Sequence, residues 1–181
     1  MRNLKKSGVL AVVVFALSAI GGSNATAASF TWSQTFLKGE ATTVQVLTVN
    51  GINGGKIQCH VAETWGEVFA WNPLKQQHFS TTYRQCAAFG GFPVHLSPAT
   101  YLFTPNGEVH LTNTFTLNVT ALGSCHITVG PQTLKPVSFT SGVTFNASNI
   151  VYTSSGGLCG SSGSNGTFTG SSVISGFSHD P

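Results

Sequence analysis

The sequence predicts an all-β protein, an antiparallel β-sandwich with a barrel-like sheet as the alternative, stapled by two disulfides. Short segments in which apolar and polar residues alternate follow one another along the chain, and a period of two is typical of strands with one buried face. Dipeptides such as Asn-Gly lie between these segments and favour tight hairpins. No amphipathic run is long enough for a substantial helix. Many short strands without intervening helices indicate a sandwich or a barrel.

The predicted strands are distributed along the whole chain beyond residue 40. A clear alternation places Phe79, Thr81 and Tyr83 on one face. The clearest hairpin joins 101–103 to 109–111 through a Pro-Asn-Gly turn. In order, we expect strands at 42–49, 56–61, 79–83, 92–96, 101–103, 109–111, 115–119, 125–129, 137–139, 143–145, 150–153, 167–168 and 172–177.

A Gly/Ser-rich stretch near the end of the chain interrupts this pattern. The segment from Ser154 to Ser172 contains six Gly and seven Ser, a composition typical of flexible linkers. Because Cys159 lies inside it and apolar residues follow, we expect a long loop that is tied down by this cysteine and leads into a closing hairpin.

The first 27 residues have the pattern of a secretory signal peptide. Arg2, Lys5 and Lys6 precede an apolar run of 12 residues, and the segment ends in Ala-Thr-Ala. This apolar run is too short for a bilayer, which needs roughly 20 residues. We therefore expect 1–27 to be removed and 28–181 to form a single secreted β domain in an extracytoplasmic setting, with no membrane insertion after cleavage.

Removing the signal peptide also removes the apparent basic charge. The chain has formal net charge +3, and the signal peptide carries three basic residues and no acidic one, so the mature domain is neutral. Its remaining cations are scattered, whereas a nucleic-acid site needs a Lys/Arg stripe to displace counterions. A polybasic membrane-surface site is excluded for the same reason. A neutral domain gives little repulsion between copies, so self-association is compatible with this composition.

Four cysteines remain, an even number that predicts two disulfides in an exported protein. No two of them have the short spacing of a zinc knuckle or of a redox-active Cys-x-x-Cys motif. Of the three possible connectivities, the sequential pairing closes the shortest loops and is the one we expect. It would join Cys59 to Cys86 and Cys125 to Cys159.

The histidines do not predict a metal site, because no pair has His-x-His or His-x-x-x-His spacing. Two of them directly follow a cysteine and should point to the face opposite that cysteine. The remaining interpretation is that they are solvent-facing strand residues. The six are His60, His78, His95, His110, His126 and His179.

No catalytic residue or cofactor is predicted either, and we expect the protein not to be an enzyme. Glu63 and Glu67 flank Trp65, which invites a glycosidase hypothesis. Four residues along a strand span roughly 13 Å, which is too far for a carboxylate pair unless the chain bends at Gly66. A nucleophile elbow of the Gly-x-Ser-x-Gly type is absent from the sequence.

The aromatic residues Trp65, Phe69 and Trp71 are the candidate binding residues. They can form an exposed platform of the kind that stacks on sugars or protein surfaces, or they can belong to the core. We expect a non-enzymatic β domain with a structural or interaction role, acting on a protein or glycan at the cell surface. A carbohydrate- or ligand-binding module that uses these rings is the alternative, and an extracellular hydrolase is the third hypothesis.

The segment Tyr83–Gly90 resembles a group of small exported bacterial proteins that carry Tyr-x-x-Cys-x-Ala-Phe-Gly. Similar segments of that group match 54–59, 125–132 and 156–170. The resemblance implies a β-rich fold with paired cysteines, and it implies no catalytic residue. The group also has a cysteine where this chain has Ala99 and a partner near Asn113, so the resemblance implies that this chain has lost one bridge.

Overall fold

The computed structural model describes residues 29–32, 36–49, 55–67, 76–104, 108–119, 125–139, 142–157, 159–175 and 177–180. The predicted signal peptide lies outside these ranges. Every helix or strand within them is a β-strand, which confirms the all-β prediction. The strands are β1 (Ser29–Trp32), β2 (Phe36–Ala41), β3 (Gln45–Thr48), β4 (Lys56–Glu67), β5 (Gln77–Ala88), β6 (Phe92–Leu96), β7 (Ala99–Phe103), β8 (Val109–Leu111), β9 (Phe115–Val119), β10 (Cys125–Val129), β11 (Gln132–Leu134), β12 (Val137–Phe139), β13 (Gly142–Ser155), β14 (Gly163–Ile174) and β15 (Phe177–Asp180).

Eight antiparallel strands close into a barrel, so of the two predicted architectures the barrel is the one that fits. The ring runs β3–β4–β5–β6–β9–β10–β13–β14, and β14 pairs with β3 to close it. Closure leaves the ring without a free edge, because each strand in it has two neighbours.

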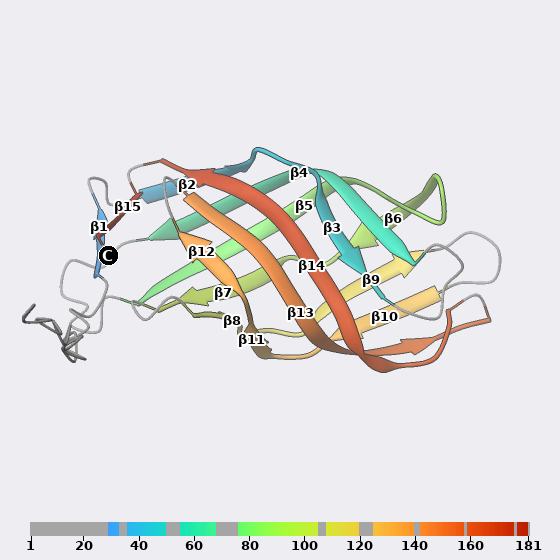
Figure 1. The fold of residues 1–181 in the computed structure, drawn as a ribbon. Helices are drawn as coiled ribbons and strands as arrows, with labels where there is room; N and C mark the ends of the chain where they lie inside the picture. The colour runs from blue at the N-terminus through green and yellow to red at the C-terminus, as the bar shows by residue number, and fades with distance from the viewer. Residues whose placement is uncertain are drawn as a thin grey trace, which may run out of the picture.

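Shorter strands lengthen the wall of the barrel toward one end (Figure 1). β2 and β7 pair with the same long strands as β3 and β6, and β8 and β11 continue the sheet from β7. β12 pairs with β13. β1 and β15 form a separate two-stranded ribbon beyond this end of the barrel.

One side-chain amide bridges β11 and β13. The Nε2 of Gln132 donates to the carbonyl of Val151 at 2.9 Å, and the Val151 N–H donates back to Oε1 at 2.9 Å. These are the two hydrogen bonds that a neighbouring backbone would supply in an antiparallel sheet. The wall therefore continues where β11 and β13 have no backbone ladder between them.

The alternation of side chains places the core inside the barrel. Along β5, Phe79, Thr81 and Tyr83 are buried as predicted, while the residues between them are exposed or half-buried. Ring contacts continue from Tyr83 through Phe168 to Phe145. Eight strands enclose an interior that is just wide enough for side chains to fill.

The predicted long loop in the Gly/Ser-rich segment is wrong for most of its length. β13 extends to Ser155 and β14 begins at Gly163, so only 156–162 connect them. Two glycines of β14 face inward at places with no room for a side chain. A Cβ at Gly166 would lie 3.0 Å from the Ile150 carbonyl oxygen, and one at Gly170 would lie 2.1 Å from Oε1 of Gln45. Here glycine allows close packing within a strand.

Both predicted disulfides are present. Cys59–Cys86 joins directly opposed residues of β4 and β5, and Cys125–Cys159 ties the connection after β13 to β10. The two bridges are consistent with an oxidising, extracytoplasmic environment. The observed connectivity is therefore the predicted sequential pairing.

Hydrogen bonds of Asn113 occupy the position at which the resemblance places a further bridge. Its Oδ1 accepts from the Thr100 N–H at 2.8 Å, and its Nδ2 donates to the Pro98 carbonyl at 2.9 Å. These two contacts lie on each side of Ala99. The side chain of Asn113 thus joins the same two chain segments without a disulfide.

No helix in the described part of the chain has the length and hydropathy needed to cross a bilayer.

Candidate binding surface

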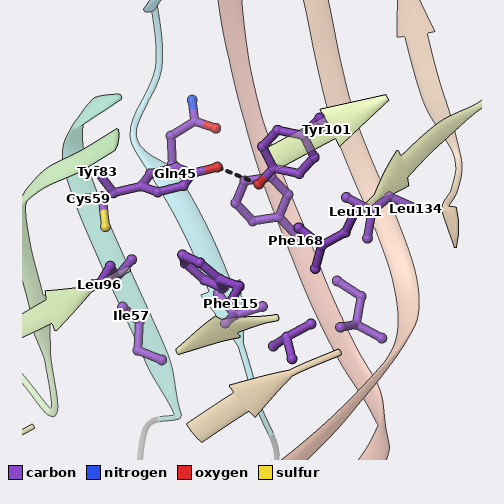
Figure 2. A pocket seen from close by; sticks show the side chains of 13 residues that line it. Gln45, Ile57, Cys59, Tyr83, Leu96, Tyr101, Leu111, Phe115, Leu134 and Phe168 are labelled. Carbon is purple, nitrogen blue, oxygen red and sulfur yellow. Dashed lines mark hydrogen bonds between the residues drawn. The ribbon is translucent and has the colours of Figure 1, made fainter. Parts of the chain in front are cut away.

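The barrel interior is filled rather than hollow (Figure 2). Two small cavities among the described residues of the interior measure about 30 Å³ and about 10 Å³. Ligand pockets are commonly about 300–1,000 Å³, whereas about 10–15 Å³ is enough for one water. Phe168, Phe115 and Leu111 are among the residues that occupy the space. A drug-sized ligand therefore has no room inside.

A tyrosine pair crosses the interior between the two cavities. The hydroxyls of Tyr83 and Tyr101 are hydrogen-bonded at 2.6 Å, as the dashed line in Figure 2 shows. Burial raises the pKa of Tyr101 to about 12. Burial first, and then the neighbouring Tyr101, raises the pKa of Tyr83 well above its ordinary value. Both hydroxyls stay protonated at neutral pH, so neither is suited to act as a general base there.

Gln45 is another polar residue of the interior and is 3% exposed. Its Nε2 donates to the carbonyls of Thr43 at 3.1 Å and Ser171 at 3.0 Å. Because these bonds link β14 to the chain leading into β3, the side chain fastens the strands that close the ring. Its role in this position is structural.

The outer wall, in contrast, carries a surface hollow of about 400 Å³. We call it the Trp65 hollow. It lies across β2, β4, β5 and β7, which are hydrogen-bonded neighbours in that order. Its rim consists of Phe36, Trp65, Glu67, His78, Ser80 and Thr100, and its floor of Gly66 and Phe79.

Gly66 gives the hollow its floor. Sequence reasoning considered a bend at this glycine, but β4 runs straight through it to Glu67. A Cβ at this position would lie 2.7 Å from the ring of Phe79, which is fully buried. The glycine is thus required by the close approach of Phe79. Because β4 continues as a strand, Trp65 and Glu67 both project outward.

Trp65 is 52% exposed, although it is flanked by neighbouring strands. Lys38 is its partner on β2, and the ammonium lies 5.5 Å from the centre of the indole ring. Lys38 also pairs with Glu40 at 2.6 Å, and hydrogen bonding to that carboxylate raises the pKa of Lys38. Lys38 does not line the hollow. The ammonium group of Lys38 therefore makes a cation–π interaction with the indole from outside the hollow.

Four polar side chains are available at the rim. Within the described residues, no side-chain hydrogen bond or ion pair is found for the carboxylate of Glu67, the imidazole of His78 or the hydroxyls of Ser80 and Thr100. Each can therefore bond a ligand without first breaking a contact inside the protein. They supply acceptors, donors and groups that can act as both.

The two glutamates of the glycosidase hypothesis are not brought together. Glu67 lines the hollow, whereas Glu63 is directed to Arg84, with 3.5 Å between carboxylate and guanidinium. Glu67 is thus the one carboxylate among the described residues that line the hollow. A glycosidase of either stereochemistry uses two carboxyl groups about 5–9.5 Å apart.

The five histidines whose side chains the structure describes point outward and do not converge. His60 and His126 are exposed while Cys59 and Cys125 are buried, as the sequence predicts. Among residues with described placement, no group of three or more His, Cys, Asp or Glu could hold a metal ion. His78 is the one histidine that lines the Trp65 hollow.

Of the three predicted aromatic residues, Trp65 lies in the hollow, and Phe69 and Trp71 lie outside the described residues. The structure adds Phe36, which is 66% exposed and was not among the candidates. The sequence does contain a signal for Phe36: neighbouring residues of a strand face opposite sides, so a buried Leu37 leaves Phe36 on the outer face. It was missed because no strand was predicted at 36–41.

Comparison with known proteins assigns no relative to this fold and surface: no family model, no curated protein and no solved structure matches the chain.

Proposed function

We propose that this chain is an exported, non-catalytic binding protein that holds carbohydrate on the outer wall of its barrel, at the Trp65 hollow. The observation that carries the proposal is a half-exposed indole beside a hollow of about 400 Å³ whose rim has uncommitted polar groups. An aromatic face binds the apolar face of a sugar ring, and polar side chains around it bond the hydroxyls.

Three further features support a neutral glycan as the ligand. The mature domain has no net charge if residues 1–27 are removed. Among the described residues, the rim contains one carboxylate and no Lys or Arg. An anionic partner would therefore meet no counter-charge in the hollow, whereas hydroxyl groups match the available donors and acceptors.

The signal-peptide pattern and the two disulfides support binding outside the cytoplasm. Cell-surface or extracellular polysaccharide is then the accessible source of the ligand. The filled interior supports the outer wall as the binding surface, because the cavities inside hold no more than water-sized groups.

The test is retention of the purified protein on insoluble polysaccharides and its retardation in gels that contain soluble ones. A panel of cellulose, chitin, starch, xylan and peptidoglycan covers the common neutral and amino-sugar chains. We expect retention on at least one of them, and Trp65→Ala should weaken that binding about tenfold or more. Val151→Ala is the matched control, since Val151 is 55% exposed on β13 and does not line the hollow.

Circular dichroism and melting temperature confirm that both variants keep the fold, which is expected because both side chains are exposed. Failure of the wild-type protein to bind any polysaccharide of the panel would refute the proposal. Equal binding by wild type and Trp65→Ala would refute the assignment of the site.

A further inference from the structure

Two exposed aromatic rings, rather than one, border the Trp65 hollow. Phe36 is 66% exposed on β2 and Trp65 is 52% exposed on β4, and both line the hollow. Neighbouring exposed apolar side chains that form one patch, unlike single exposed ones, often mark an interaction site. Phe36 lies at the first residue of β2, outside the hydrophobic core.

The strand register fixes how the two rings are placed. Phe36 is directly opposite Glu67, and Lys38 is directly opposite Trp65, so Phe36 and Trp65 are diagonal neighbours. Diagonal positions on one face of an antiparallel pair are about 7–8 Å apart. A single sugar ring covers one aromatic ring, so it cannot stack on both of these side chains at once.

Each ring also has its own polar neighbours across the strands. Trp65 is opposite Ser80 on β5, and Ser80 is opposite Thr100 on β7. All three line the hollow and form one row across the sheet.

The second row begins at Phe36. Phe36 is opposite Glu67 on β4. Because Gly66 is opposite Phe79 in an antiparallel pair, the next residue Glu67 lies across from His78 on β5. Phe36, Glu67 and His78 therefore form a second row, on β2, β4 and β5, which lies two residues along the strands from the first row and is displaced from it by one strand. Each row thus presents one aromatic ring and two polar side chains to the hollow, and Lys38 occupies the β2 position of the first row outside the hollow.

From these two rows we infer that the Trp65 hollow holds two adjacent sugar-binding subsites and that its ligand is a linear, uncharged oligosaccharide of at least two sugars. Trp65, Ser80 and Thr100 form the first subsite, and Phe36, Glu67 and His78 form the second. Glu67 disfavours an acidic sugar in the second subsite, because a second anion there would be repelled. This inference rests on the proposed carbohydrate binding.

The test measures affinity as a function of chain length, with mono-, di-, tri- and tetrasaccharides of the polysaccharide that the panel selects. Calorimetry and ligand-observed NMR give the dissociation constants. For the wild type, we expect the affinity to rise about tenfold or more between the mono- and the trisaccharide. Phe36→Ala should lose this gain, whereas Trp65→Ala should weaken binding of every length, the monosaccharide included.

Val151→Ala again serves as the control and should bind every length as the wild type does. Monosaccharide binding as tight as trisaccharide binding would overturn the second subsite, and so would a Phe36→Ala variant with undiminished trisaccharide affinity. Absence of any sugar binding by the wild type is a different result, because it would refute the proposed function itself. An acidic oligosaccharide that binds better than its neutral counterpart would contradict the role of Glu67.

Discussion

Substituting alanine for Gly170 should destabilise the barrel, because the new methyl group has no space. Its Cβ would lie 2.1 Å from Oε1 and 2.4 Å from Cδ of Gln45. Gln45 cannot give way cheaply, since its amide holds the carbonyls of Thr43 and Ser171. Losing these hydrogen bonds costs about 1 kcal/mol each, and overpacking adds about 1–3 kcal/mol. The lower entropy of the unfolded variant offsets about 0.4–1 kcal/mol.

The expected net loss is therefore about 3 kcal/mol, or a melting temperature lower by roughly 6–12 °C for a chain of this size. Urea unfolding of the oxidised protein, followed by circular dichroism, measures it. Gly130→Ala is the matched control, because a Cβ there has no atom within 4 Å, and its stability should change by no more than about 0.5 kcal/mol. In a Gln45→Ala background, Gly170→Ala should cost clearly less, since the two positions are coupled. Equal stability of Gly170→Ala and Gly130→Ala would refute the argument that this glycine is a packing position.

Three other predictions concern the interior, a bridge and the wall. Burial raises the pKa of Tyr101 to about 12 and that of Tyr83 well above its ordinary value, so the two hydroxyls lose their protons at lower pH in the unfolded chain than in the folded one. The unfolding free energy should therefore fall as pH rises above about 10. In urea titrations, Tyr101→Phe should make this fall less steep. A pH-independent stability up to pH 11 would contradict it. Replacing Cys125 and Cys159 together by serine should cost about 3–4 kcal/mol in the chain-entropy model, measured as a lower urea midpoint, and an unchanged midpoint would show that this bridge adds no stability. Gln132→Ala should remove the acceptor of the Val151 N–H and speed hydrogen exchange of that amide, whereas unchanged protection would show that another group covers it.

The sequence was sufficient to predict most of the strands, although not β1, β2 or β11, and it did not predict how they close. Alternation correctly identified the inward face of β5 because a buried face needs apolar residues at every second position. Closure depends on β14 pairing with β2 and β3, contacts that join residues such as Ser171 and Thr43, far apart in the chain. No local pattern records such a pairing, so the sequence favoured a sandwich, whereas the barrel given as the alternative is the architecture that fits.

The main error of the sequence prediction is the long loop expected in the glycine-rich segment. The composition of 154–172 is typical of linkers, yet Gly166 and Gly170 lie within β14. Both positions need glycine because Ile150 and Gln45 approach their Cα atoms closely. A close approach between distant segments is a property of the folded barrel and leaves no signal in composition. The same holds for Gly66, which looked like a bend and is the floor beneath Trp65.

The candidate site was predicted in part. Trp65 was identified from its aromatic neighbours and proves to be exposed, whereas Phe36 and the polar rim come together only through strand pairing. Glu67, His78 and Thr100 are contributed by three strands. Their common face could not be derived without the register.

The most direct test of carbohydrate binding on the outer wall is an NMR titration of the isotope-labelled protein with the tightest-binding oligosaccharide. We predict that the resonances of Trp65, His78, Ser80 and Thr100 shift with a common saturation curve, while those of the interior residues Tyr83, Tyr101 and Phe168 do not. Shifts confined to the interior, or no saturable shifts at the hollow, would contradict the account.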